Sequence, residues 1–190
     1  ISKLQKDKEA NFWDIIDPDV SWDYLTGIFL SIFKREKWEK NKNFLDLKQL
    51  ADKRYWSSTD NTLLHAKIFC KSFKNSKCFI SAKPLSVNLI GEREWGDLYE
   101  FIEIIRIPEI IDFYRSQGLS WKKYYYNKNF ALRNYLNYMI KIVLGGKKKG
   151  LNYIDFKRDI INNLIFPNVY LSIFFSSLRY IKKKLKKTDR

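Results

Sequence analysis

The spacing of apolar residues changes along the chain. In Tyr24–Phe33 seven of ten positions are apolar and the run is interrupted by Gly27, which suits a buried strand better than an amphipathic helix. Beyond Trp95 the period becomes helical, because Leu98, Phe101 and Ile105 follow one another at spacings of three and four. The pattern therefore predicts an α/β first half and a helical second half.

Shorter elements are predicted from turn and cap residues. Pro84 separates two short apolar runs, Cys78–Ser81 and Leu85–Leu89, which both have the character of strands. Gly118 and the pair Gly145-Gly146 are natural helix ends. Pro108 is expected in the first turn of a new helix. The predicted helices are Lys34–Lys42, Ser57–Phe73, Pro108–Gln117, Asn129–Leu144, Tyr153–Ile165 and Asn168–Lys187.

The composition is that of a globular protein. The 190 residues are 45% apolar and 17% aromatic, which excludes disorder as the main state, and 7 glycines and 4 prolines exclude collagen-like and linker classes. No uncharged apolar run reaches the roughly 18 residues of a membrane span, and Ile1–Lys8 is too charged for a signal peptide. We therefore expect a cytosolic segment. Because the chain starts with Ile1, we also expect a fragment of a longer protein.

Positive charge is concentrated in the C-terminal third. Residues 1–121 carry 19 Lys/Arg and 18 Asp/Glu, whereas residues 122–190 carry 17 Lys/Arg and three Asp, so the second segment supplies +14 of the net +15. Five of the six positions in Lys182–Lys187 are lysine. Such a tail predicts a polyanionic partner, either nucleic acid or an anionic membrane.

The last apolar segment combines that charge with aromatic residues. Ile165–Lys187 is apolar around much of a helical circumference and ends in lysines, which favours a helix lying in the headgroup region of a membrane. A C-terminal helix packed on the domain, with a frayed basic end, remains an equal alternative. Tyr124–Tyr126 lies among lysines and could also stack nucleobases. The residues assigned to membrane or polyanion contact are Phe174, Phe175, Lys182, Lys183, Lys184, Lys186 and Lys187.

Few residues offer metal chemistry. Asp17-Pro18-Asp19 has the spacing of a metal-binding Asp-x-Asp pair, but proline between acidic residues favours a turn. Cys70 and Cys78 would need two further ligands to hold a metal, so we expect small buried residues there. No metal site is predicted in this chain.

Asp60 is the main candidate for catalysis. It lies at a predicted helix start, where a carboxylate either caps the helix or acts as a general base. His65 follows on an apolar helical face, where histidine is more often a core residue than a catalytic one. Both alternatives remain open for each residue.

Three segments together resemble a known family. The segment Ser21–Trp38, the helix start Trp56-Ser57-Ser58-Thr59-Asp60 with His65 after it, and the strand pair Lys77–Val87 with Lys-Pro-Leu occur in this order. They are similar to the acceptor-side part of bacterial family 2 glycosyltransferases, particularly the abequosyltransferase-like group. The resemblance covers about Asp19–Gly96.

The resemblance implies a GT-A fold in which one half binds the acceptor and the other binds the nucleotide sugar. Residues 1–96 would be the acceptor-side part of a GT-A domain, and residues 97–190 a helical extension with a basic C-terminus. The nucleotide-binding half, with its metal-binding Asp-x-Asp and Mg²⁺ or Mn²⁺, would precede this chain. The resemblance implies that Asp60 deprotonates the acceptor hydroxyl and that Trp56 and His65 contact the acceptor.

These observations lead to one preferred function and two alternatives. We expect part of a glycosyltransferase that moves a sugar from a nucleotide sugar to a lipid-linked or saccharide acceptor in surface polysaccharide (O-antigen) synthesis, at the inner face of the cytoplasmic membrane. Trp56 and Trp95 would stack on sugar rings, and the chain alone would be inactive. The alternatives are a nucleic-acid-binding module, which the neutral body makes unlikely, and a helical interaction module.

Overall fold

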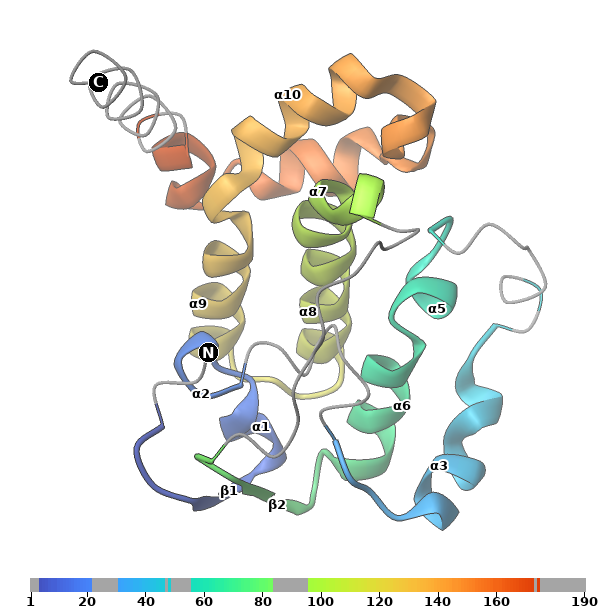
Figure 1. The fold of residues 1–190 in the computed structure, drawn as a ribbon, viewed down its shortest axis with the longest axis vertical. Coiled ribbons are helices and arrows are strands. Elements are labelled where there is room, and N and C mark those ends of the chain that lie inside the picture. The colour runs from blue at the N-terminus through green and yellow to red at the C-terminus, as the bar shows by residue number, and fades with distance from the viewer. Residues whose placement is uncertain are drawn as a thin grey trace, which may run out of the picture. The chain divides into compact units, whose positions relative to one another are not determined.

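The computed structural model describes residues 4–21, 31–46, 48, 56–83, 96–172 and 174. Helices dominate these residues, and the one sheet among them has two strands (Figure 1). The chain divides into two compact units: residues 1–94 with 109–127, and residues 95–108 with 128–190. The predicted boundary at residue 96 lies beside the first division, but residues 109–127 group with the N-terminal unit.

The first unit contains the sheet. Strand β1 (Lys8–Asn11) pairs antiparallel with β2 (Lys77–Ile80), with Lys8 opposite Ile80 and Asn11 opposite Lys77. The prediction of a strand near Cys78–Ser81 is confirmed. Strand β1 was not predicted, because its sequence Lys-Glu-Ala-Asn has no apolar alternation and its side chains are largely exposed. Most of the predicted strand Tyr24–Phe33, and all of Leu85–Leu89, lie outside the described residues; Ser31–Phe33 has no regular structure.

Two short helices follow β1. Helix α1 (Phe12–Ile15) begins directly after the strand, and the amide of Phe12 donates to the carbonyl of Ser76 at 3.0 Å. Helix α2 (Pro18–Ser21) begins at a proline, whose missing N–H costs nothing in a first helical turn. Phe12 and Ile16 are both almost completely buried. The start of the chain is therefore anchored in the core of its unit.

The predicted helices in residues 34–73 are confirmed, with differences in detail. Helix α3 (Arg35–Asn41) ends one residue before the predicted Lys42, and a 3-10 helix (Lys42–Phe44) follows it directly. The segment Ser57–Phe73 forms two helices, α5 (Thr59–Thr62) and α6 (Leu64–Phe73). Leu63, whose backbone leaves the helical region, separates them.

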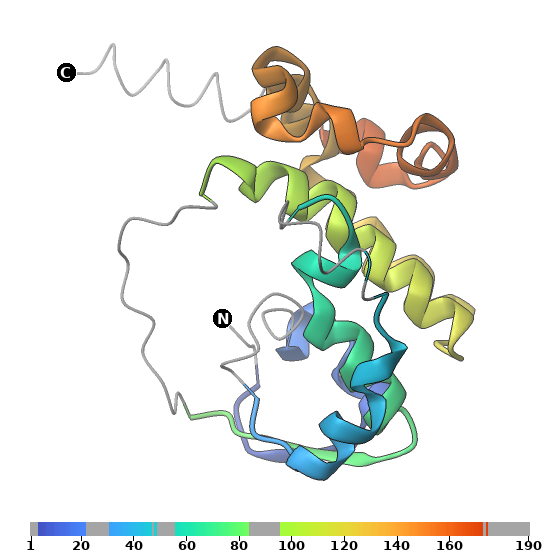
Figure 2. The ribbon, with the colours of Figure 1, turned by 90° about the vertical axis from the view of Figure 1, so that its right-hand side faces the viewer.

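Aromatic side chains join α3 to α6, which lie side by side in both ribbon views (Figures 1 and 2). The Trp38 ring lies 5.4 Å from Phe33 and 6.0 Å from Phe69, and Phe33 also meets Phe69 edge-on. Edge-to-face packing of this kind adds to the free energy gained by burying the rings. The amphipathic pattern of α6 thus finds its partner in the aromatic residues around α3.

The helical stretch after Gly96 runs through Pro108. A 3-10 turn (Gly96–Leu98), α7 (Tyr99–Phe101), a π-helix (Ile102–Arg106) and α8 (Ile107–Ser116) follow one another without interruption. The predicted helix Pro108–Gln117 is confirmed as α8 with Pro108 in its first turn, but no break separates α8 from the π-helix before it. The π-helical segment immediately before Pro108 already departs from the α-helical bonding pattern, which helps the chain accommodate a residue without an N–H.

The end of α8 is as predicted. Gly118 has a φ of +117°, a conformation that glycine adopts without strain, and the amide of Leu119 then bonds to the carbonyl of Tyr114 at 3.0 Å. Tyr114 is fully buried, and its hydroxyl donates to the carbonyl of Ala66 in α6 at 2.9 Å. This hydrogen bond fixes the C-terminal part of α8 against α6 within the first unit.

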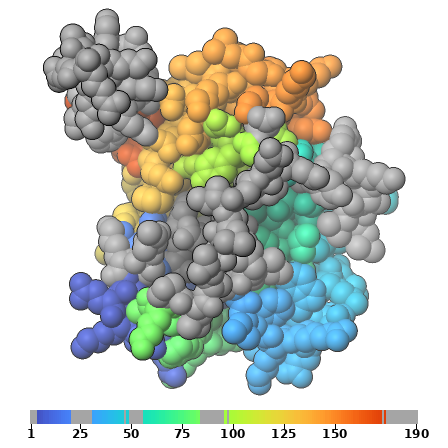
Figure 3. Space-filling view, in the orientation of Figure 1, coloured from blue at the N-terminus to red at the C-terminus, as the bar shows by residue number. Residues whose placement is uncertain are grey.

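The predicted helix Asn129–Leu144 is present as two helices. Helix α9 (Trp121–Ala131), a 3-10 turn (Leu132–Asn134) and α10 (Tyr135–Gly145) run in sequence, and the glycine pair ends α10. Gly146 has a φ of +60° and starts a 3-10 helix (Gly146–Lys149). Figure 3 shows atoms of α10 and of this turn at the molecular surface.

The segment predicted as helix Tyr153–Ile165 is helical but irregular. It contains 3-10 helices at Leu151–Tyr153 and Ile161–Asn163 around a π-helix (Phe156–Ile160), and a last helix begins at Pro167. Buried hydrogen bonds hold it, because the carbonyl of Asp159 accepts from the Tyr135 hydroxyl at 2.6 Å and from the Asn163 amide at 2.7 Å. In the described parts of the chain, no helix has the length and apolar character needed to cross a membrane.

Candidate functional site

Asp60 lies in the first turn of α5 and is buried, with 7% of its surface exposed. One carboxylate oxygen, Oδ1, forms an ion pair with the ammonium of Lys67 in α6. Within the part of the chain that the structure describes, the other oxygen, Oδ2, accepts a hydrogen bond only from the backbone amide of Asp46, at 3.4 Å. The carboxylate is thus fixed through one oxygen and weakly engaged through the other.

Asp60 is not the cap of its helix. Ser58 occupies the N-cap position, with extended backbone angles. The side chain of Asn61 accepts from the Ser58 amide at 3.2 Å and donates to the Ser57 hydroxyl at 2.9 Å. Because neighbouring residues already satisfy the helix start, the Asp60 carboxylate is available for its pairing with Lys67.

Of the other residues assigned to substrate binding, the structure describes His65 and Trp56. His65 is buried, with 6% of its surface exposed, and its ring meets Phe69 edge-on at 5.9 Å. Trp56 is half-buried in the turn before α5. Trp95, Phe175 and Lys182, Lys183, Lys184, Lys186 and Lys187 lie outside the described residues, and Phe174 is exposed.

The acidic pair Asp17-Pro18-Asp19 forms a turn. The amide of Asp19 donates to the Asp17 carboxylate at 2.8 Å, and α2 begins at the proline between them. Among the residues that the structure describes, no three His, Cys, Asp or Glu side chains are arranged to hold a metal ion. None of the described residues is therefore assigned to a metal ion.

Burial raises the pKa of both cysteine thiols. Cys70 is completely buried, and burial raises its pKa to about 12. Cys78 is half-buried in β2, and burial raises its pKa as well. Both cysteines are free, as expected for structural residues.

A pocket of about 430 Å³ opens elsewhere in the first unit. Three separate segments contribute to it: the start of α1, the turn after α6 and the start of α9. An indole, two lysines and several short polar side chains line it. The lining residues are Asn11, Trp13, Asp14, Lys74, Asn75, Gly118, Ser120 and Lys123.

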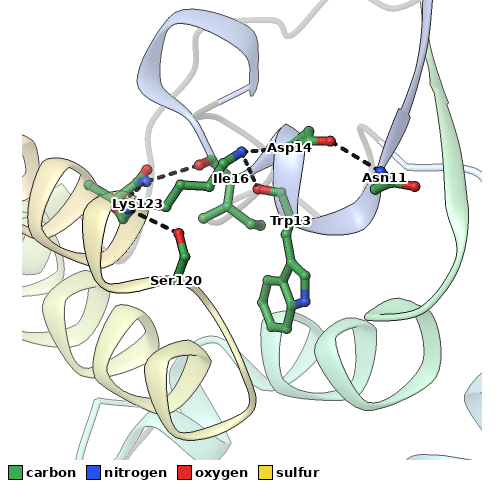
Figure 4. Close-up of polar contacts among 7 residues, drawn as sticks. Asn11, Trp13, Asp14, Ile16, Ser120 and Lys123 are labelled. Atoms are coloured by element: carbon green, nitrogen blue, oxygen red, sulfur yellow. Dashed lines mark hydrogen bonds and ion pairs between the residues drawn. The ribbon is translucent and has the colours of Figure 1, made fainter.

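An ion pair across the pocket joins α9 to α1 (Figure 4). The Lys123 ammonium donates to the Asp14 carboxylate and to the Trp13 carbonyl, both at 2.8 Å. The hydrogen bond from Lys123 lowers the pKa of Asp14, with a smaller contribution in the same direction from Asn11. The hydroxyl of Ser120 in turn accepts from the backbone amide of Lys123 at 3.4 Å. These contacts fix the positions of four residues that line the pocket: Trp13, Asp14, Ser120 and Lys123.

Next to the pocket, Asn127 adds hydrogen bonds to the contact between α9 and the end of α1. Its side-chain amide donates to the carbonyl of Ile16 at 2.9 Å and to that of Lys123 at 2.7 Å, and the residue is fully buried. Its amide oxygen, in contrast, has no hydrogen-bond partner in the described structure. Such a buried junction favours one fixed position of α9 relative to α1.

The pocket suits binding of a polar ligand better than catalysis. Lys74, Asn75 and Ser120 can donate hydrogen bonds, and the Trp13 ring supplies an apolar side, but the Asp14 carboxylate is already held by Lys123. Sequence reasoning missed this pocket, because its residues come from positions 11–14, 74–75 and 118–123. No local motif connects segments that far apart.

In the aromatic cluster Tyr124–Tyr126, Tyr124 is engaged within the fold, whereas Tyr126 is exposed. Tyr124 donates to the Asp112 carboxylate at 2.9 Å, and burial raises its pKa above the usual tyrosine range, with Asp112 acting in the same direction. Lys128 is buried, with its ammonium 5.5 Å from the centre of the Phe166 ring.

Comparison of the chain with protein-family models, with curated proteins and with solved structures found no match.

Proposed function

We propose that this chain is the acceptor-side part of a glycosyltransferase that moves a sugar from a nucleotide sugar to a saccharide or lipid-linked acceptor in surface polysaccharide synthesis. The resemblance of Ser21–Trp38, Trp56–Asp60 and Lys77–Val87 to family 2 enzymes supports this function. Donor binding and the divalent cation belong to a preceding half of the enzyme, and the chain alone does not transfer sugar.

The observation that carries the proposal is the asymmetric environment of the Asp60 carboxylate. Lys67 holds Oδ1, whereas Oδ2 has, among the described residues, only the 3.4 Å contact with the Asp46 amide. A general base must be fixed in position and must keep one lone pair for the proton that it removes. Oδ2 of Asp60 meets both conditions.

The proposed step follows from that geometry. An acceptor hydroxyl takes the place of the long Asp46 contact and donates its hydrogen bond to Oδ2 of Asp60. As the acceptor oxygen forms a bond to the anomeric carbon of the donor, the hydroxyl proton moves to Oδ2 and the nucleoside diphosphate leaves with the electron pair of the broken bond. Lys67 keeps the carboxylate oriented throughout, and inversion at the anomeric carbon results.

The test is the change Asp60→Asn in the complete enzyme, with sugar transfer and thermal unfolding both measured. The amide keeps the shape of the side chain but cannot take the proton, so we expect turnover to fall by about a hundredfold or more. Asp46→Asn is the matched control: the same change on an exposed neighbour whose backbone amide, not its side chain, contacts Asp60.

Loss of the ion pair is a separate effect that the test must distinguish. Lys67→Met removes the partner of Asp60 but leaves the carboxylate in place, so this variant should be destabilised and yet keep more activity than Asp60→Asn at a temperature where both are folded. Near-normal turnover of folded Asp60→Asn would show that the Asp60–Lys67 pair is purely structural.

A further inference from the structure

Exposed apolar side chains are concentrated in one stretch of the second unit. Of 17 large apolar residues that are exposed in the described part of the chain, 11 lie between positions 140 and 174. They are Ile140, Val143, Leu144, Leu151, Phe156, Ile161, Leu164, Ile165, Tyr170, Leu171 and Phe174. Isolated exposed apolar residues are normal on soluble proteins, but a concentration of this kind indicates an interaction surface.

Helix α10 shows how such residues are presented. Ile140, Val143 and Leu144 follow at spacings of three and four and therefore share one face of the helix, and they are 59%, 55% and 83% exposed. Tyr135 and Ile142, seven residues apart, are buried and mark the opposite face. Helix α10 is thus apolar on both faces, with only one of them covered.

Positive charge adjoins the uncovered face. Lys147 and Lys148 are exposed in the 3-10 turn that directly follows α10. Residues 128–174 contain eight Lys/Arg but only two acidic residues, Asp155 and Asp159. Asp159 is buried and paired with Arg158, which leaves Asp155 as the exposed acid of this stretch. Arg133, Lys141, Lys149 and Arg158 are paired with Glu103, Glu100 and Asp159. The positive charge directly next to the apolar face therefore comes from Lys147 and Lys148.

We propose that the exposed face of α10, defined by Ile140, Val143 and Leu144, lies on an anionic lipid bilayer, with Lys147 and Lys148 on the lipid phosphates. An apolar face bordered by lysines has the chemistry of an interfacial helix. Nucleic acid would use the lysines but gain little from the apolar side chains, and a second copy of this chain would bring like charge to the same place.

The dimensions of α10 agree with this placement. Its 11 residues span about 16 Å, roughly half the hydrocarbon thickness of a bilayer, so the helix lies on the membrane and does not cross it. The inference does not rest on the glycosyltransferase proposal, and its residues differ from the C-terminal lysines assigned to the membrane from the sequence.

The experiment is co-sedimentation of the chain with phosphatidylcholine vesicles that contain phosphatidylserine. Leu144→Glu places a charge on the exposed face of α10 and should weaken binding about tenfold or more. Ile32→Glu, the same kind of change at a fully exposed residue of the first unit, is the matched control and should leave binding unchanged. Lys147→Gln with Lys148→Gln should weaken binding at low salt only.

Each contrary result is distinct. Equal losses for Leu144→Glu and Ile32→Glu would mean that α10 has no special role, and the proposal would fail. Tighter binding to duplex DNA than to vesicles at matched salt would assign the basic surface to nucleic acid instead. Concentration-dependent dimers that Leu144→Glu abolishes, with no vesicle binding, would make this face a contact between copies. Turnover enters none of these measurements, so they are independent of Asp60.

Discussion

Asp14 and Lys123 lie 109 residues apart in the sequence, and the Lys123 ammonium is 2.8 Å from the Asp14 carboxylate. The same ammonium donates to the Trp13 carbonyl, so one lysine of α9 satisfies two acceptors of α1. This pair forms one side of the pocket in the first unit, and its energetic contribution can be measured through its pH dependence.

The hydrogen bond from Lys123 lowers the pKa of Asp14, so the folded state favours the ionised carboxylate. The resulting stability is present above the unfolded pKa of about 3.9 and is lost as the pH falls through the lower folded value. Both side chains are partly exposed, at 45% and 31%, so the contribution should be below about 1 kcal/mol. Asp14→Asn should therefore cost stability in urea unfolding near pH 7 but much less near pH 3.

Glu9→Gln, on the exposed face of β1, is the control for that measurement and should show no such pH dependence. A cost of Asp14→Asn that was equal at both pH values would contradict a role for ionisation and would attribute the loss to packing alone.

Two glycines with positive φ provide a second test, within the second unit. A methyl group at Gly150, whose φ is +87°, would lie 2.8 Å from Cδ2 of Phe101, a fully buried ring. At Gly146, with a φ of +60°, a methyl group would meet nothing within 4 Å. Gly150→Ala combines backbone strain with a steric clash against a buried ring and should cost about 3–5 kcal/mol, whereas Gly146→Ala brings backbone strain alone and should cost about 1–3 kcal/mol.

Chemical denaturation of the two variants measures this difference directly. Equal destabilisation by the two alanines would mean that Phe101 does not pack against Gly150, and the position of the turn after Lys149 would then be wrong.

A buried ion pair should contribute more to the free energy of unfolding than an exposed one. The side chains of Asp60 and Lys67 are 9% and 18% exposed, whereas those of Glu39 and Lys42 are 43% and 55% exposed. Lys67→Met leaves a buried carboxylate without its partner and should cost about 3 kcal/mol, but Lys42→Met, in a solvent-exposed pair, should cost much less. Adding Asp60→Asn to Lys67→Met should recover part of the loss, because it removes the uncompensated charge.

Urea unfolding of the single and double variants tests this prediction. A loss for Lys67→Met as small as that for Lys42→Met would show that solvent reaches Asp60 freely.

Local patterns explain which elements could be predicted from the sequence. Helix α6 and the glycine ends of α8 and α10 were predicted because periodicity, caps and positive φ are encoded within a few residues. Strand β1 was missed because it depends on pairing with β2, about 70 residues away, and its own residues are polar. Pro108 correctly indicated the first turn of α8, but the π-helix that joins α8 to the preceding helix was not predicted, because it has no sequence signature.

The candidate sites also differ in whether their residues lie close together in the sequence. Asp60 was found because it belongs to a short motif at a helix start, but its partner Lys67 lies on the next helix and was not predicted. The pocket at Trp13 and Lys123 depends wholly on long-range contacts. Residues brought together by the tertiary fold leave no periodic or motif signal when only one sequence is read.

The last prediction concerns the two thiols, which report the packing of α6 and β2 separately. Cys70 is completely buried and its pKa is raised to about 12, so only ~10⁻⁴ of it is thiolate near pH 8, and reaction with Ellman's reagent must await unfolding. Cys78 is half-buried, and its pKa is also raised, so it should react slowly in the folded protein. We therefore expect one slow thiol under native conditions and two fast thiols in guanidinium chloride. Cys78→Ser should remove the native reaction and Cys70→Ser should leave it unchanged. A native Cys78→Ser protein that still reacted readily would place Cys70 at the surface and contradict the packing of α6, because no reagent can reach that sulfur while the helix is docked.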